Sequence, residues 1–334
     1  MNVTVVACMK NEGPFILEWL AHHRAIGVNR FIIFSNDCTD GTKELLDALD
    51  DAGVIRHLEN PNCLVQSNQR INVAFAYARH LKEYQRADYV ALIDVDEFIN
   101  VKAGDGTLKA AFDEIGPFDV LSFNHVNFGF GGVISFDPVP LTDQFFMTGG
   151  EQVGAGVKAR TAIKSLHRVR DDILPFNHFP TIPPASYDKV AWCDGSGNHL
   201  RISAKKPRRK MLKVSQRTEL LQLNHYVLRS VESFLVKHDR GNVFGFDKID
   251  AIRYATEYNH NRVEDRSILQ SSQIRETEMD RLLGLPDIRH WHDISVARHR
   301  ARIEALMEDE QGKKLYDTLA EKVHAEKAES CASL

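Results

Sequence analysis

The chain has 334 residues, with 42 lysines and arginines against 46 aspartates and glutamates, which gives a formal net charge of −4. This balance argues against a general nucleic-acid binder, which normally carries a basic excess. Hydrophobic residues make up 43% and charged residues 26%, so the composition excludes disordered and collagen-like proteins and predicts two domains, or one large α/β domain with an extension.

Within the first 130 residues, apolar runs alternate with segments of helical periodicity. In chain order we expect a strand at 3–9, a helix at 14–26, a strand at 30–34, a helix opening at 40–42 and ending before Gly53, a strand at 54–58, a helix at 66–84, and strands at 89–93 and 118–123. Continuous apolar strands separated by helices predict a parallel sheet that is covered on both faces. Such sheets bind their ligands at the carboxyl ends of the strands.

The later chain has a different character. Glycine, proline and aromatic residues gather at 127–132 and 173–184, which predicts loops and antiparallel strands within 124–215. A further strand is expected at 220–228, and helical patterns dominate from Val231 onward. The charged, alanine-rich segment 295–328 predicts a helical hairpin on the surface or a frayed end.

Five scattered cysteines form no CxxC pair, which indicates a reducing compartment and no structural zinc site. No apolar stretch approaches the roughly 18 residues that span a bilayer, and the short run at 3–9 is not typical of a signal peptide. We therefore expect a cytoplasmic protein. The run Lys205-Lys206-Pro207-Arg208-Arg209-Lys210 is interpreted as a solvated loop, as a peripheral contact with anionic headgroups at the inner membrane face, or as a contact with an acidic polysaccharide acceptor.

The strongest chemical signal is the segment Asp94-Val95-Asp96-Glu97, which follows the apolar strand at 89–93. Side chains two residues apart at a strand end point the same way, so the carboxylates of Asp94 and Asp96 repel each other. A divalent cation is the usual compensation, because Mg²⁺ or Mn²⁺ prefers carboxylate oxygens and keeps positions open for phosphates. An acidic turn without a ligand is the alternative.

Two other strand ends are also polar. Residues 9–14 follow the first strand, and residues 35–42 follow the second. Asparagine and aspartate side chains at such turns can hydrogen-bond to a nucleobase and to ribose hydroxyls. Ordinary helix capping is the alternative, and it accounts in part for Asp40 and Thr42.

These motifs, taken together and in this order, resemble those of the glycosyltransferase family 2-like group and of the related family 92, or DUF23-type, enzymes. The resemblance is carried by Lys10-Asn11-Glu12, Glu18-Trp19-Leu20, His22-His23, the run 36–42 and Asp94–Phe98. It covers about the first 100 residues and is far more specific than a DxD triplet alone. A weaker match runs from Asn224-His225-Tyr226 to Arg240-Gly241.

The resemblance implies a GT-A fold with a mostly parallel sheet and a C-terminal helical extension. It implies a nucleotide-sugar donor, most simply a UDP-sugar, and a divalent metal, most often Mn²⁺. The expected parts are a nucleotide-sugar half (1–130), an acceptor half (131–245) and the extension (246–334). The side chains implied at the donor nucleotide are Asn11, Glu12, Asn36, Asp37, Asp40 and Asp94. Apart from the resemblance, Arg70, on the helix after residues 66–69, is a candidate for the donor phosphates.

By the same resemblance, Asp94 and Asp96 hold the metal. His225 matches the late histidine that completes the metal shell in GT-A enzymes, with a structural histidine as the alternative. Lys237 and Arg240 share a helix face and could neutralise the departing diphosphate, although a solvated helix face is the commoner explanation. Two acidic residues are usual in family 2 where this chain has Ser35-Asn36, which leaves the identity of the base open.

The catalytic base must lie within hydrogen-bond reach of an acceptor hydroxyl. Four residues of the loop-rich middle qualify by type: Asp194, Asp188, Asp172 and His178. We favour Asp194, because its aromatic neighbour and glycine turn suit a sugar-binding loop, and a plain Asp-Gly turn is the alternative.

We therefore expect a metal-dependent, hexosyltransferase-type glycosyltransferase. It would act with inversion on a glycan, lipid-linked or protein acceptor. Two rivals stay open. A nucleotidyltransferase acting on a sugar phosphate would need a glycine-rich basic loop after the first strand, where this chain offers only Lys10 and Gly13. A non-catalytic nucleotide-binding protein would keep the fold without the activity.

Overall fold

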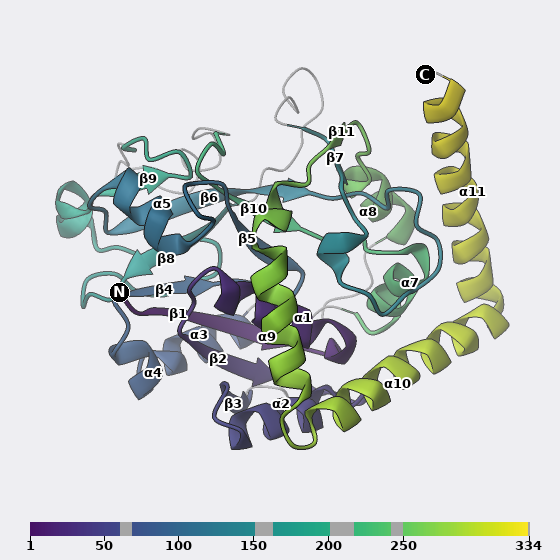
Figure 1. Ribbon diagram of the computed structural model, residues 1–334, viewed down its shortest axis with the longest axis horizontal. Coiled ribbons are helices and arrows are strands. Elements are labelled where there is room, and N and C mark those ends of the chain that lie inside the picture. The colour runs from purple at the N-terminus through teal and green to yellow at the C-terminus, as the bar shows by residue number, and fades with distance from the viewer. Residues whose placement is uncertain (61–68, 151–162, 201–216, 242–249, 333–334) are drawn as a thin grey trace.

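A twisted mixed sheet with helices on both faces forms the centre of the computed structural model, which describes residues 1–60, 69–150, 163–200, 217–241 and 250–332 (Figure 1). The strand order is β3-β2-β1-β4-β8-β6-β10-β5, and β9 pairs with β6. The strands of this sheet are β1 Val3–Met9, β2 Arg30–Ser35, β3 Arg56–Glu59, β4 Tyr89–Leu92, β5 Glu97–Val101, β6 Val120–Asn127, β8 Ile163–Arg168, β9 Trp192–Asp194 and β10 Leu221–His225.

The first four strands are parallel, and β1 is buried on both sides. Alternate residues of β1 face opposite layers, as the period of two requires. Val5 and Ala7 pack in one hydrophobic cluster with residues of α1, whereas Val6 and Cys8 pack in another with residues of α3. The prediction of apolar strands covered on both faces is confirmed for this half of the chain.

The helices of this half follow the strands. Pro14 opens α1 at a position where its missing N–H costs no hydrogen bond. In α2, Leu45, Leu46 and Leu49 form the buried face. The helices are α1 Gly13–Ala25, α2 Thr42–Asp51, α3 Gln69–Ala78, α4 Lys82–Gln85 and α5 Leu108–Ile115.

The second half departs from an all-parallel sheet. Strand β8 runs antiparallel to both β4 and β6, and β5 runs antiparallel to β10. Strand β10 lies parallel to β6, so their carboxyl ends meet at the same edge as the ends of β1 and β4. The sheet is therefore mixed: parallel pairing joins β1 to β4 and also joins β10 and β9 to β6, whereas β8 and β5 run antiparallel to their neighbours.

One local expectation is wrong, and two elements were not predicted. The helix predicted at 66–84 is two helices within the described residues, α3 and α4, with a break at 79–81. Strand β5 and helix α5 were not predicted, although Thr107 caps α5 by accepting from the backbone N–H of Ala110. Strand β5 was missed because its five buried residues follow the acidic turn directly, without a second apolar run.

The remaining helices lie along one side of the sheet and at its end (Figure 1). They are α7 Val231–Asp239, α8 Ala251–Tyr258, α9 Ser272–Leu283, α10 Ile288–Glu308 and α11 Glu310–Ala332. Helix α9 packs on α1, α10 packs on α1, α2 and α7, and α11 packs on α7 and α8. Helices α10 and α11 meet at an open angle, so the predicted hairpin is wrong (Figure 1).

Helix α10 approaches the loops at the carboxyl edge of the sheet closely. A Cβ atom on Gly13 would lie 2.3 Å from the hydroxyl oxygen of Ser295, and one on Gly41 would lie 2.9 Å from the same oxygen. Gly41 also has a φ of 96°, which favours glycine. The C-terminal helices are therefore fitted to the loops that follow β1 and β2.

Short elements complete the chain. Strands β7 Met147–Thr148 and β11 Val263–Glu264 form a separate antiparallel pair. Single 3₁₀ turns lie at Leu141–Asp143, Pro184–Lys189 and Ser267–Ser271. Every helix among the described residues is too short or too polar to cross a bilayer.

Candidate active site

The acidic segment lies where the sequence predicts, in the turn between β4 and β5 at the carboxyl edge of the sheet. The backbone of this turn is held firmly from two sides. The indole N–H of Trp19 donates to the carbonyl oxygens of Asp94 (3.1 Å) and Glu97 (2.9 Å). The backbone N–H of Tyr226 donates to the carbonyl oxygen of Asp96 at 2.8 Å. The carboxylates are therefore presented from a fixed backbone.

Asp94 and Glu97 share one buried lysine. The Lys164 ammonium, on β8, lies 3.0 Å from Asp94 and 3.4 Å from Glu97. Desolvation raises the pKa of Asp94 to about 6 against the pull of Lys164. The pKa of Glu97 is held well below its usual range, because Lys164 and His125 outweigh the desolvation of its buried carboxylate.

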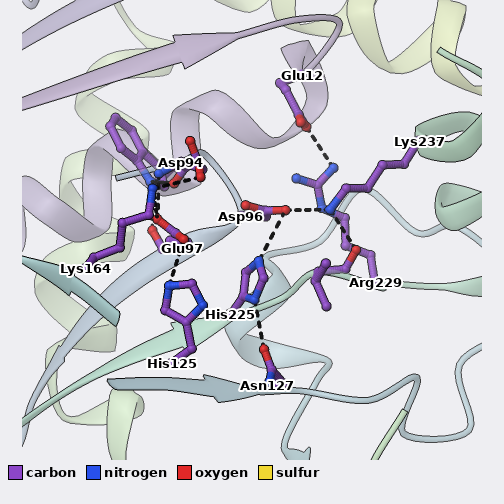
Figure 2. Close-up of polar contacts among 12 residues, drawn as sticks. Glu12, Asp94, Asp96, Glu97, His125, Asn127, Lys164, His225, Arg229 and Lys237 are labelled. Atoms are coloured by element: carbon purple, nitrogen blue, oxygen red, sulfur yellow. Dashed lines mark hydrogen bonds and ion pairs between the residues drawn. The ribbon is translucent and has the colours of Figure 1, made fainter. Parts of the chain in front are cut away.

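Asp96 turns toward a different set of partners (Figure 2). Its carboxylate lies 2.5 Å from the Lys237 ammonium and 3.8 Å from Nε2 of His225. These charges hold the pKa of Asp96 well below its usual range in spite of desolvation. Desolvation lowers the pKa of His225 to about 3, so the imidazole is neutral at neutral pH. Nδ1 of His225 lies 2.8 Å from the amide oxygen of Asn127.

Glu12 closes the site from the β1 side. Both of its oxygens are used by arginines: Oε2 lies 2.8 Å from Nη1 of Arg229, and Oε1 pairs with Arg240. Arg240 also donates to the backbone carbonyl oxygens of Lys10 and Asn11. Glu12 thus ties the loop after β1 to the segment around α7.

Among the described residues, the site holds as many cations as carboxylates. Glu12, Asp94, Asp96 and Glu97 face Lys164, Arg229, Lys237 and Arg240. The repulsion between Asp94 and Asp96 is therefore offset by two lysines, where the sequence argument expected a divalent ion. Any divalent ion that enters would disturb this balance unless an anion enters with it.

A set of metal-ligating groups nevertheless lies at the same edge. The register of β5, β10 and β6 places Glu97 beside His225 and His225 beside Asn127. Ligand atoms of Glu97, His125 and His225 lie within 4.8 Å of one another. Nε2 of His125 is buried and has no hydrogen-bond partner in the described chain, although Oε1 of Glu97 lies 2.9 Å away. An oxygen and two imidazoles fit Mn²⁺, so the residues present suit the ion that the family resemblance implies.

The residues expected at the nucleoside divide into two groups. Asn11 and Asp40 link the loops after β1 and β2: the backbone N–H of Thr39 donates to Oδ1 of Asn11 (2.7 Å), and the backbone N–H of Gly13 donates to Asp40 (3.4 Å). Asn11 has a left-handed backbone, with φ at 50°. Asn36 is fully buried, donates to the carbonyl oxygens of Met9 and Phe34, and accepts from Asn60. Its amide is therefore occupied within the protein.

For three further predicted sites, Asp37, Arg70 and the run 205–210, the structure describes little or nothing. Asp37 lies in the same loop with a φ of 45°. Arg70 lies in α3, but its side chain is outside the described residues. The basic run 205–210 lies outside the described residues altogether.

The four base candidates lie in different surroundings. Asp194 is buried, and its carboxylate accepts from the backbone N–H groups of Ser196 and Asn198, both at 2.9 Å, within its own turn. Asp172 pairs with Arg170, and Asp188 is exposed. His178 lies against β8: Nδ1 of its ring lies 3.1 Å from the carbonyl oxygen of Ile163, the neighbour of Lys164, and desolvation and the Lys164 charge lower the pKa of His178 to about 4.

Sequence reasoning missed Lys164, His125 and Arg229. The signal for Lys164 is a lysine in the middle of an otherwise buried strand, where an unpaired ammonium is very costly. For His125 and Arg229 the sequence offers no comparable signal, because their partners Glu97 and Glu12 lie far away in the chain, in the second case at a separation of 217 residues.

Residues 3–238 match the sequence profile of glycosyltransferase family 92. A family 92 protein of Oryza sativa subsp. japonica is 28% identical over 133 residues, which are 35% of this chain and 22% of the rice protein. One of Ricinus communis is 30% identical over 105 residues, which are 31% of this chain and 18% of that protein. The matched segments thus make up about a fifth of the length of these plant relatives.

Solved structures show only a distant likeness. S. aureus TarS (residues 1–349) is 12% identical and aligns with 99% of this chain and 92% of its own at a TM-score of 0.32. An active-site mutant of LgtC is 12% identical, covers 76% of this chain and 94% of its own, and has a TM-score of 0.32. Scores this low carry no argument, so the assignment rests on the family match across most of the chain. The protein belongs to glycosyltransferase family 92.

Proposed function

We propose that the protein transfers a hexosyl group from a UDP-sugar, with Mn²⁺ or Mg²⁺, to a hydroxyl of a glycan, lipid-linked glycan or protein, with inversion at the anomeric carbon. One observation supports this most. At the carboxyl edge of the sheet, carboxylates, histidines and cations converge from β6, β10, the turn after β4 and the loop after β1. The family assignment supports the more general part of this proposal, a glycosyltransferase with a nucleotide-sugar donor.

The loops after β1 and β2 are proposed to bind the nucleoside. Asn11 and Asp40 join these loops, and Asp37 lies in the second. UDP is our choice of nucleotide because of the family resemblance of these loops. Asn36, whose amide is fully used, supports the loop from beneath.

The metal is proposed to bind at His225, with Asp96 on one side and Glu97 and His125 on the other. Asp94 lines the same edge. When bound there, a divalent ion neutralises the diphosphate as a leaving group. Because the described charges already balance, we expect ion and diphosphate to bind together.

In the transfer step, the bond between the anomeric carbon and the diphosphate oxygen breaks, and the acceptor oxygen forms the new bond to that carbon. Lys237 and Arg240 are proposed to stabilise the charge that develops on the departing diphosphate. The acceptor hydroxyl loses its proton to a base. We propose His178 for this role ahead of Asp194, because its imidazole is neutral at neutral pH and contacts β8 next to Lys164, the ion-pair partner of Asp94.

Replacing His178 with glutamine is expected to lower kcat by about 10²- to 10⁴-fold, the usual range for loss of a general base, with donor affinity unchanged. Asp194→Asn is the matched comparison. It should weaken its turn and lower the melting temperature, while the folded fraction keeps its kcat. Steady-state transfer assays with donor titrations measure both. A normal kcat for His178→Gln together with a large loss for Asp194→Asn would restore Asp194 as the base.

Titration of the wild-type protein with UDP, with and without Mn²⁺, tests the proposal as a whole. We expect UDP to bind with Mn²⁺ and only weakly without it, and UDP-sugars to be hydrolysed or transferred. Preference for a nucleoside triphosphate with release of pyrophosphate would favour the nucleotidyltransferase. Metal-dependent binding with no turnover of any UDP-sugar would favour the non-catalytic binder.

A further inference from the structure

Arg229, in the turn between β10 and α7, is a buried arginine with unused hydrogen-bond donors. The residue is 3% exposed. Its Nη1 donates to Glu12 at 2.8 Å. Within the part of the chain that the structure describes, its Nε and Nη2 have no hydrogen-bond partner. Buried donors without a partner destabilise a fold, so this arrangement calls for a reason.

The two unused donors lie on one edge of the guanidinium. An arginine presents Nε–H and Nη2–H side by side, and two parallel N–H groups match two oxygens of a phosphate. The opposite side of the group is already fixed by Glu12 through Nη1. The free edge is thus the one suited to bidentate binding of an oxyanion.

The structure also restrains this group from one face. The guanidinium carbon lies 3.6 Å from the centre of the Phe15 ring, a cation–π contact that limits its movement. The backbone of Arg229 has a φ of 61°, which is uncommon for a residue other than glycine. Backbone strain of this kind clusters at ligand sites, where the rest of the fold holds it in place.

The surroundings of Arg229 indicate which oxyanion it would bind. The Arg229 guanidinium lies beside the Lys237 ammonium and close to Asp96 (Figure 2). Its positive charge acts to lower the pKa of both groups, which shows that it lies within electrostatic range of them. Two cations placed together at the carboxyl edge of the sheet, next to a metal-ligand set, suit a diphosphate.

We propose that Arg229 binds the diphosphate of the donor through its Nε and Nη2, with Glu12 as the positioning residue that holds the guanidinium in place. This inference rests on the proposed nucleotide-sugar function and adds a specific residue to it. Lys237 then contributes a second, point-like charge from the next helix. Arg240 pairs with the opposite oxygen of Glu12 and keeps that carboxylate aligned.

The test compares Arg229→Gln and Arg229→Lys in the full chain, titrated with UDP, uridine and inorganic pyrophosphate in the presence of Mg²⁺. We expect Arg229→Gln to bind UDP and pyrophosphate about ten- to a hundredfold more weakly, the effect of losing a charged hydrogen bond. Uridine affinity should not change. Arg229→Lys keeps the charge but loses the paired edge, so it should recover part of the affinity.

Arg302→Gln is the matched control, because Arg302 is a surface arginine paired with Asp239 at 2.7 Å. It should bind all three probes as the wild type does. If Arg229→Gln folds and binds pyrophosphate with wild-type affinity, the inference is wrong. If that variant does not fold, Arg229→Lys decides: wild-type affinity for pyrophosphate overturns the inference, and a clear loss supports it.

The outcomes separate this inference from the proposed function. A wild-type protein that binds UDP, with Arg229 variants that bind it equally well, overturns only the role of Arg229. A wild-type protein that binds pyrophosphate through Arg229 but neither UDP nor uridine overturns the UDP donor and leaves the diphosphate site standing. A wild-type protein that binds none of the probes overturns both.

Discussion

Asp96→Asn is expected to weaken metal-dependent UDP binding by more than about a hundredfold and to abolish transfer. The Asp96 carboxylate contacts both the Lys237 ammonium and the His225 ring. In the proposed site it would therefore bind the metal ion and also hold Lys237 in place. The change also leaves the Lys237 ammonium without a carboxylate partner. Breaking a buried ion pair in this way costs about 3–5 kcal/mol, so the melting temperature should fall as well. Thermal melts and UDP titrations with Mn²⁺ measure the two effects.

A second variant separates the two effects. Asp96→Asn combined with Lys237→Met removes both charges of the pair, and replacing both members of a buried pair is often neutral for stability. We expect this double variant to recover most of the lost melting temperature but none of the Mn²⁺-dependent UDP affinity. If the double variant recovers UDP affinity together with stability, Asp96 is a structural residue and the proposed metal site is wrong.

The second large effect is a loss of stability in mild acid. His22, His167 and His299 are buried, and desolvation lowers their pKa values to about 4, about 4 and about 3; the pKa of His23 shifts in the same direction. The unfolded chain has histidine pKa values near about 6.5. Between about pH 6.5 and 4 the unfolded state therefore binds more protons, and the free energy of unfolding falls as the pH falls.

Each such histidine contributes up to about 1.4 kcal/mol per pH unit in this window. Asp94 and Glu18 act in the opposite direction, because desolvation raises their pKa values. We still expect a net uptake of at least about two protons on unfolding near pH 5. Urea titrations between about pH 7.5 and 5 measure this uptake as the slope of the unfolding free energy against pH.

His299→Phe provides the control for this prediction. The His299 ring packs against Phe15 and Phe136, with ring centres 5.6 and 4.5 Å apart, so phenylalanine suits the same pocket. The variant should reduce the slope by close to one proton. An unfolding free energy that stays constant from about pH 7 to 5 would show that these histidines are protonated in the folded protein.

The sequence predicts the first half of the fold well, because apolar strands and amphipathic helices carry their own periodicity. Strands β1, β2 and β4 and helices α1 and α2 lie within a few residues of the expected bounds. The prediction of antiparallel strands within 124–215 is confirmed by β8, but the insertion of β8 between β4 and β6 was not predicted. Its six residues include a lysine and an arginine, and the burial of the lysine depends on partners far away in the chain.

The same contrast holds for the site. Asp94, Asp96 and His225 could be found because they follow apolar strands, and the structure brings them to one edge of the sheet (Figure 2). The identity of their partners could not be found. Two carboxylates at positions i and i+2 repel each other unless positive charge lies nearby. Here that charge comes from Lys164 and Lys237, which lie 70 and 141 residues away in the chain from Asp94 and Asp96. Only the folded chain shows which cations supply it.

The contact between Ser295 and the two glycines has a consequence for how the enzyme can change over evolution. Ser295 abuts Gly13, the neighbour of Glu12, and Gly41, the neighbour of Asp40. A substitution at Ser295 of α10 would therefore shift both turns that we propose for the sugar nucleotide, without changing any residue of those turns. Under the proposed function, donor preference would then respond to residues of α10 that lie behind these turns.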